Sequence, residues 1–207
     1  MPSLTSRSIR ILLLFAALLP AIAFSRVAQA DWLDDVRQGG YVIVLRHGAT
    51  FSNQADTDPL NIKNVAAQRQ LNDQGRAQAK AMGEAMRALK IPVGSVVTSM
   101  FQRAVDTGML LGFGEVKSTF DVTEGGLVVT PDENARRTQA LRKLAGMAQP
   151  AGSNLVIVTH KPNILDAFGK DWFDVREGEA SVFKPDGQGG YKPVARVRAD
   201  EWSALRK

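Results

Sequence analysis

The chain has 207 residues, of which 44% are hydrophobic, with 18 glycines, 9 prolines and a formal net charge of +5. These proportions are ordinary for a globular chain, so they exclude collagen, wholesale disorder and a polytopic membrane protein. The sequence has no cysteine and two histidines, which excludes disulfides, cysteine nucleophiles and thiolate metal sites and argues against a multi-histidine zinc centre.

The first thirty residues have the pattern of a secretory signal peptide. Arg7 and Arg10 precede an apolar run at 11–24, and alanines at 28 and 30 mark a cleavage point before Asp31. The run is shorter than the roughly 20 residues that span a bilayer. We therefore expect residues 1–30 to be cleaved and the protein to be periplasmic or secreted without stable membrane insertion. Retention of the segment as an anchor stays open.

The positive charge of the chain depends on this leader. Removal of residues 1–30 takes away Arg7, Arg10 and Arg26 and no acidic residue, so 23 basic and 21 acidic groups remain, a net charge of +2. Because the excess charge belongs largely to the leader, we expect no nucleic-acid partner.

Residues 31–207 alternate between strand-like and helix-like patterns without a repeat or a long linker, which indicates one domain. Predicted strands lie at 41–45, 95–98, 116–122, 155–158, 180–184 and 191–198, the last two as a hairpin. Predicted helices lie at about 73–90, 101–109, 131–148 and 162–169. The spacing of Met82 and Met86 predicts a buried face for the first of them, and Met109 belongs to a similar apolar face on the second. This order predicts a three-layer α/β/α sandwich with a mainly parallel central sheet. The continuously apolar runs 41–45 and 155–158 belong at its doubly covered centre.

Two of the predicted helices carry start signals. Asn72 or Asp73 supplies an N-cap for the first of them, and Pro92 follows its end. For the helix at 131–148, Thr130 is the predicted N-cap, Pro131 the first helical residue, and Glu133 the second half of a capping box.

The two histidines occupy equivalent positions. His47 is the second residue after the apolar run 41–45, and His160 is the second residue after the run 155–158. Open α/β sheets bind ligands beyond the carboxyl ends of their strands. A single such histidine is commonly a structural loop residue, but two in the same context indicate a site.

The residues around His47 suit a phosphoryl group. Residues 46–53 read Arg-His-Gly-Ala-Thr-Phe-Ser-Asn. Arg46 offers forked donors to phosphate oxygens, Gly48 permits close backbone approach, and Thr50 and Asn53 add neutral donors. Arg103 follows the strand 95–98 by five residues and can reach the same edge of the sheet.

The motif Arg-His-Gly-x-Thr-x-x-Asn at 46–53 resembles the signature of the histidine phosphatase superfamily, which has the phosphoglycerate mutase-like fold. Ser99-x-x-x-Arg103-Ala-x-x-Thr107 is similar to the second phosphate-binding segment of that family, and Thr159-His160 to its later histidine. The similarity runs in order over about 40–200. The chain end, with Trp202 after a strand, resembles the small single-domain branch.

The resemblance implies a role for each of these residues. His47 would be the nucleophile that forms a phosphohistidine intermediate, and Arg46, Arg103 and His160 would surround the transferring group. Gly48, Thr50, Asn53 and Ser99 would bind the substrate. The chemistry would need no metal and no cofactor.

A leaving alcohol needs a proton, and Glu124 lies where relatives often place the general acid. The alternative is an ordinary loop carboxylate. Some small members of the family lack the acid and act on better leaving groups such as phosphohistidine.

Other charged residues have structural interpretations. Lys63, Arg69 and Arg76 are interpreted as solvated surface, although they could border the mouth of the site. Arg136 and Arg137 could serve the substrate or pair with Glu133, and the carboxylates at 177 and 179 are interpreted as structural.

The sequence thus predicts an exported, metal-independent phosphohydrolase of the histidine acid phosphatase type. Its substrate would be a phosphomonoester or related compound, either a phosphorylated small molecule or a component of the cell envelope. The alternative is a non-catalytic module on the same fold that binds phosphosugars or phospholipid headgroups. Neither the natural substrate nor the oligomeric state follows from the sequence.

Overall fold

The computed structural model describes residues 32–125 and 128–206, and the predicted signal peptide lies outside this part of the chain. The described residues form a six-stranded sheet in the order β3-β2-β4-β1-β5-β6. The strands are β1 (Val42–Arg46), β2 (Val93–Thr98), β3 (Val116–Ser118), β4 (Asn154–Thr159), β5 (Ala180–Pro185) and β6 (Tyr191–Val197).

The sheet is mainly parallel, as predicted. β1, β2, β3 and β4 are mutually parallel through the pairs β1–β4, β4–β2 and β2–β3. β5 runs antiparallel to β1, and β6 antiparallel to β5, so the predicted terminal hairpin forms one edge of the sheet. The two fully apolar runs became β1 and β4, which are neighbours at the centre and are buried over nearly all their length.

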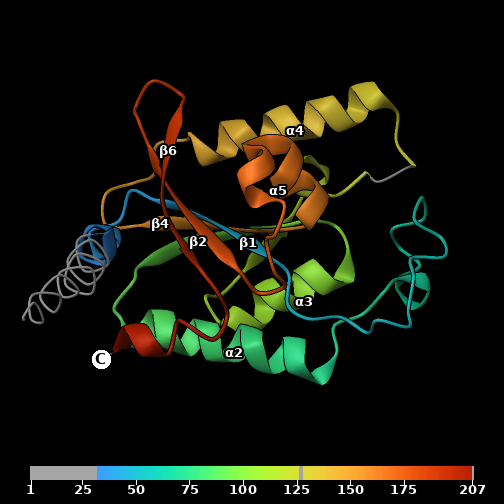
Figure 1. Cartoon of the computed structure of the whole chain (residues 1–207), viewed down its shortest axis with the longest axis horizontal. Coiled ribbons are helices and arrows are strands. Elements are labelled where there is room, and N and C mark those ends of the chain that lie inside the picture. The colour runs from blue at the N-terminus through green and yellow to red at the C-terminus, as the bar shows by residue number, and fades with distance from the viewer. Residues whose placement is uncertain (1–31, 126–127, 207) are drawn as a thin grey trace, which may run out of the picture.

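Helices cover both faces of the sheet, which confirms the three-layer α/β/α architecture. Figure 1 shows α4 (Pro131–Ala145) and α5 (Lys161–Phe168) above the sheet, and α2 (Asp73–Ala88) and α3 (Gln102–Leu111) below it. The period-two geometry of β1 divides its side chains between two cores. Ile43 and Leu45 pack with Met82 of α2, whereas Val42 and Val44 pack with Leu141 of α4.

Some predicted boundaries were wrong for local reasons. The strand predicted at 116–122 stops at Ser118, because the hydroxyl of Thr119 accepts a hydrogen bond from the N–H of Asp121 and starts a 3-10 turn at 120–122. The first helix ends at Ala88, before the predicted residue 90, and Lys90 takes a left-handed conformation with φ of 58°. Met109, expected on a buried helix face, is 61% exposed.

The helix caps agree with the sequence in part. Asn72 accepts a hydrogen bond from the N–H of Gly75, and Thr130 accepts one from the N–H of Glu133. The second half of the predicted capping box does not form, because the Glu133 carboxylate binds the side chains of Arg136 and Arg137 instead. Among the helices of residues 32–125 and 128–206, none is both long and apolar enough to cross a bilayer.

Candidate active site

His47 lies at the carboxyl end of β1 and is held by its neighbours on both sides. Its backbone N–H donates to the carbonyl of Thr159 at the end of β4, at 3.0 Å. Its ring Nδ1 lies 2.8 Å from the carbonyl oxygen of Gly48. A carbonyl can only accept, so Nδ1 carries the ring proton and Nε2 keeps a free lone pair. The ring is 2% exposed, and its orientation is therefore fixed by packing.

His160 follows β4 and is the N-cap residue of α5. The centroids of the two imidazole rings are 5.1 Å apart, with an angle of 61° between the ring planes. Nε2 of His160 lies 2.7 Å from the hydroxyl of Ser99, which also accepts a hydrogen bond from the N–H of Phe101. Two histidines separated by more than a hundred residues of sequence thus meet at one end of the sheet.

Two arginines reach the same end of the sheet. Arg103, in the first turn of α3, is fully buried, and its two terminal nitrogens donate to Asp56 at 2.9 Å and to Glu124 at 2.7 Å. Arg46, the last residue of β1, donates to the carbonyl of Val175 and lies 3.6 Å from the carboxylate of Glu177.

The site contains buried polar atoms that have no hydrogen-bond partner. Six such side-chain atoms occur in the described part of the chain, and four of them are Nε of Arg46, Nε of Arg69, Nε of Arg103 and Nδ1 of His160. Buried donors are almost always paired in folded proteins, and an unpaired one costs free energy. Unpaired donors from three arginines around two histidines are the arrangement expected of a site built for an anion with several oxygens.

The electrostatics keep both imidazoles neutral. Burial, followed by the charge of Arg103, lowers the pKa of His47 from 6.5 to about 3. Burial also lowers the pKa of His160 well below its ordinary value, with Arg103 again the largest charge effect. Each ring is therefore unprotonated near neutral pH, which is the form that can act as a nucleophile or as a neutral hydrogen-bonding group.

Glu124 enters the site from the segment between β3 and α4. One carboxylate oxygen accepts the hydrogen bond from Arg103, and the other lies 3.7 Å from Nδ1 of His160. Burial raises the pKa of this carboxyl group, although Arg103 opposes the shift. A carboxyl group that is hard to ionise is suited to donate a proton.

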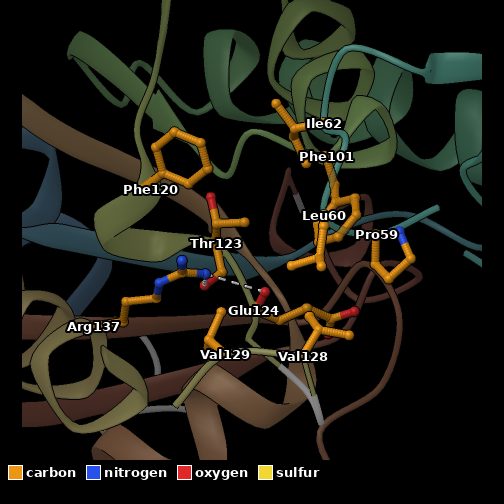
Figure 2. Close-up of a pocket in the computed structure, with 10 residues that line it drawn as sticks. All are labelled: Pro59, Leu60, Ile62, Phe101, Phe120, Thr123, Glu124, Val128, Val129 and Arg137. Atoms are coloured by element: carbon orange, nitrogen blue, oxygen red, sulfur yellow. Dashed lines mark hydrogen bonds between the residues drawn. The ribbon is translucent and has the colours of Figure 1, made fainter. Parts of the chain in front are cut away.

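Arg137 holds the segment that carries Glu124. Its guanidinium donates to the backbone carbonyls of Thr123 and Glu124 and is ion-paired with Glu133 on the preceding turn of α4. Figure 2 shows Arg137 beside Thr123 and Glu124. Arg136, which pairs with Glu133 and Asp121, is exposed.

The predicted substrate-binding residues have other partners. Gly48 donates its N–H to the hydroxyl of Thr107, and a Cβ there would lie 2.7 Å from the carbonyl of Gly75, so glycine is required by the approach of α2. The Thr50 hydroxyl donates to Glu177. Ser99 contacts His160 rather than an open site, and Asn53 is exposed on the loop. Their roles as substrate ligands stay predictions.

The structure adds residues that sequence reasoning had interpreted otherwise or had not noticed. Arg69, interpreted as solvated surface, contributes to the lowered pKa of both histidines. Asp56 was not noticed, yet one of its oxygens accepts hydrogen bonds from the backbone N–H of Arg69 and from the side chain of Arg103. The backbone pairing of Thr50 with Leu71 brings Arg69 back to the site. Within the described residues, no group of three or more histidines and carboxylates is arranged to hold a metal ion.

Comparison with known families identifies the part of the chain that holds most of this site. The model of the histidine phosphatase superfamily (branch 1) matches residues 42–125, which include Arg46, His47, Arg103 and Glu124. This segment is therefore similar in sequence to branch 1 histidine phosphatases. A comparison with curated proteins gave no match.

Solved structures of several phosphatases share the fold over about three quarters of the chain. The protein histidine phosphatase SixA, complexed with tungstate, is 16% identical with a TM-score of 0.54, and the match covers 78% of this chain and 98% of SixA. A mycobacterial glucosyl-3-phosphoglycerate phosphatase complexed with VO3 is 18% identical, with 75% and 97% coverage and a TM-score of 0.53. Phosphoserine phosphatase from Entamoeba histolytica, with 3-phosphoglyceric acid, is 16% identical, with 75% and 95% coverage and a TM-score of 0.53. At these identities the likeness establishes the fold.

Proposed function

We propose that the protein is a metal-independent phosphohydrolase that acts on phosphomonoesters through a phosphohistidine intermediate on His47. One observation carries the proposal. The lone pair of His47 Nε2 lies in a site where three arginines and a second histidine offer buried polar atoms without partners. Binding of an anion alone would need the donors but not a neutral nucleophile among them.

In the first step, Nε2 of His47 attacks the phosphorus atom while the bond from phosphorus to the leaving oxygen breaks. Arg46, Arg69 and Arg103 neutralise the charge on the three remaining phosphoryl oxygens. We assign the ring proton of His160 to Nδ1, where it can bind a phosphoryl oxygen, so that Nε2 accepts from the Ser99 hydroxyl 2.7 Å away. The leaving oxygen takes a proton from Glu124 and departs as an alcohol.

In the second step, the Glu124 carboxylate accepts a proton from a water molecule as the water oxygen attacks phosphorus. The bond between phosphorus and Nε2 breaks, inorganic phosphate leaves, and His47 returns to its neutral form. The two steps together consume one water and one phosphomonoester and leave both protein groups unchanged.

The ion pair between Glu124 and Arg103 would couple the protonation of Glu124 to the binding of substrate. In the free protein, Arg103 stabilises the Glu124 carboxylate. A bound phosphoryl dianion would compete for the same guanidinium and add negative charge nearby, and both effects raise the pKa of Glu124. Binding of substrate would therefore favour the protonated acid.

The proposal also concerns the substrate beyond its phosphoryl group and the location of the protein. The structural neighbours are named as phosphatases of quite different phosphorylated compounds, so they support the phosphoryl group and leave the rest of the substrate open. A periplasmic or secreted location is proposed from the pattern of residues 1–30 alone.

The proposal is tested by release of inorganic phosphate from p-nitrophenyl phosphate in the presence of a metal chelator. The protein and a His47→Gln variant are compared, and thermal stabilisation by tungstate checks that the variant still folds and binds oxyanions. We expect phosphate release that is lost in the variant by a factor of at least about 10³. Stabilisation by tungstate without phosphate release from the unmodified protein would support a non-catalytic binding module instead.

A further inference from the structure

A pocket of about 220 Å³, lined mainly by apolar residues, includes Glu124 of the proposed phosphoryl site in its wall (Figure 2). Seven of its ten lining residues are apolar, and they come from the loop before α2, the start of α3 and the segment before α4. Among them Leu60 is 78% exposed, and Phe120 and Val128 are also exposed. Solvent-exposed apolar side chains around a pocket indicate a binding site for an apolar group.

Phe101 forms the wall between this pocket and the catalytic groups. The centroid of its ring lies 5.4 Å from that of His160 and 4.4 Å from the guanidinium carbon of Arg103. Glu124, the proposed acid, also lines the pocket. A group bonded to the oxygen that Glu124 protonates therefore lies at the entrance to the pocket.

Most of the polar groups that line the pocket are paired within the protein. The Thr123 hydroxyl donates to the carbonyl of Thr119 and accepts from the N–H of Met100. Arg137 is paired with Glu133 and with backbone carbonyls, and Glu124 is paired with Arg103. A polar or charged leaving group would lose its hydration here and gain few hydrogen bonds in return, which is unfavourable.

We propose that the pocket selects phosphomonoesters whose leaving group is an uncharged, apolar alcohol the size of a short alkyl chain or a single ring, an inference that rests on the proposed function. An apolar cavity of about 150 Å³ accommodates a benzene ring, so this volume suffices. The proposal disfavours substrates such as phosphoserine and phosphoglycerate, whose charged leaving groups need more polar partners than this mainly apolar lining offers.

The test uses alkyl phosphates of increasing length, because their leaving alcohols have similar acidity and differ mainly in apolar surface. We expect kcat/KM to rise about two- to fourfold per methylene from ethyl to hexyl phosphate. Glycerol phosphate and phosphoserine should be hydrolysed more slowly than butyl phosphate. A flat series, or faster hydrolysis of the polar esters, overturns the proposal.

Variants test whether the dependence of kcat/KM on chain length arises in this pocket. Leu60→Asn replaces an exposed apolar residue of the lining with little risk to folding and should flatten the dependence on chain length. Met109 is also exposed but lies outside the pocket, so Met109→Asn should preserve that dependence. An unchanged series in Leu60→Asn and in Phe120→Ala would overturn the assignment to this pocket.

A binding series separates this inference from the proposed function. The affinity of His47→Gln for the same alkyl phosphates is measured by calorimetry. If the unmodified protein hydrolyses no ester but the affinity of His47→Gln rises with chain length, the hydrolase proposal fails and the pocket proposal stands. If esters are hydrolysed and neither rate nor affinity depends on chain length, the hydrolase stands and the pocket fails.

Discussion

Arg103 and Glu124 form a partly buried ion pair in which the guanidinium Nη2 donates to the carboxylate Oε1 over 2.7 Å. The pair joins the first turn of α3 to the segment before α4, and it places a proton donor beside a group that would hold the phosphoryl oxygens. The chemistry proposed for this protein depends on this contact, because binding at one partner changes the protonation of the other.

Replacing Glu124 should affect substrates according to their leaving groups. Glu124→Gln keeps the size of the side chain but cannot donate a carboxylic proton. We expect kcat for an alkyl phosphate to fall about 10²–10³-fold, and kcat for p-nitrophenyl phosphate to fall less than tenfold, because nitrophenolate leaves without a proton. Steady-state kinetics on both substrates check this. Glu115→Gln, an exposed carboxylate away from the site, is the control, and equal losses on both substrates would argue against an acid role.

The pH dependence should also depend on Glu124. The pKa of His47 is lowered to about 3, so its nucleophilic form is present above that pH, whereas the pKa of Glu124 is raised by burial. Alkyl phosphate hydrolysis should therefore be favoured at acidic pH and decline as pH rises through the pKa of Glu124. In Glu124→Gln this decline should be missing. Dividing the rate of the unmodified protein by that of Glu124→Gln on the same substrate cancels the effect of the substrate's own ionisation. A ratio that does not change with pH would contradict the assignment of Glu124 as the acid.

Arg69 should contribute to binding of the phosphoryl group. Its Nε is buried without a partner, whereas Arg76, a few residues later, is an exposed side chain paired with Asp106. We expect Arg69→Met to lower kcat/KM about 10–100-fold and to reduce thermal stabilisation by tungstate, since hydrogen bonds to charged groups are strong. Arg76→Met should leave both quantities unchanged. Equal values of kcat/KM and of tungstate stabilisation in the two variants would indicate that Arg69 is a solvated surface residue.

Buried neutral histidines should make the fold sensitive to acid. The unfolded chain protonates His47 below about pH 6.5, but the folded protein resists protonation down to about pH 3. The unfolded state thus binds more protons in this window, and stability falls as pH falls. Between pH 7 and pH 4 the free energy of unfolding should drop by about 3 kcal/mol more in the unmodified protein than in His47→Gln. Urea unfolding in a buffer without oxyanions measures this, and parallel curves would contradict the lowered pKa.

The parts of the fold that the sequence predicts are those with strong local patterns. The apolar runs that became β1 and β4 are continuous and β-branched, and the histidines that follow them lie together because neighbouring parallel strands end at the same edge. The spacing of Met82 and Met86 predicted a buried helix face correctly.

The rest of the site depends on contacts that have no local pattern. Asp56 and Arg69 lie in a long irregular segment, and only its backbone pairing with residues near His47 brings them to Arg103 and the two rings. Gly48, Thr50 and Ser99 lie close in sequence or space to the two histidines, but their hydrogen bonds go to partners supplied by other elements, so the sequence alone could not identify those partners.

The central claim is that His47 carries the phosphoryl group during turnover. It is tested most directly by rapid mixing with p-nitrophenyl phosphate, alkaline quenching, and mass spectrometry of the intact protein and its peptides, since a phosphohistidine survives base but not acid. We predict one added phosphoryl group on the peptide containing His47, lost on acid treatment and missing in His47→Gln. Phosphate release at the unmodified rate in His47→Gln, or a phosphoryl group trapped on another residue, would contradict the account.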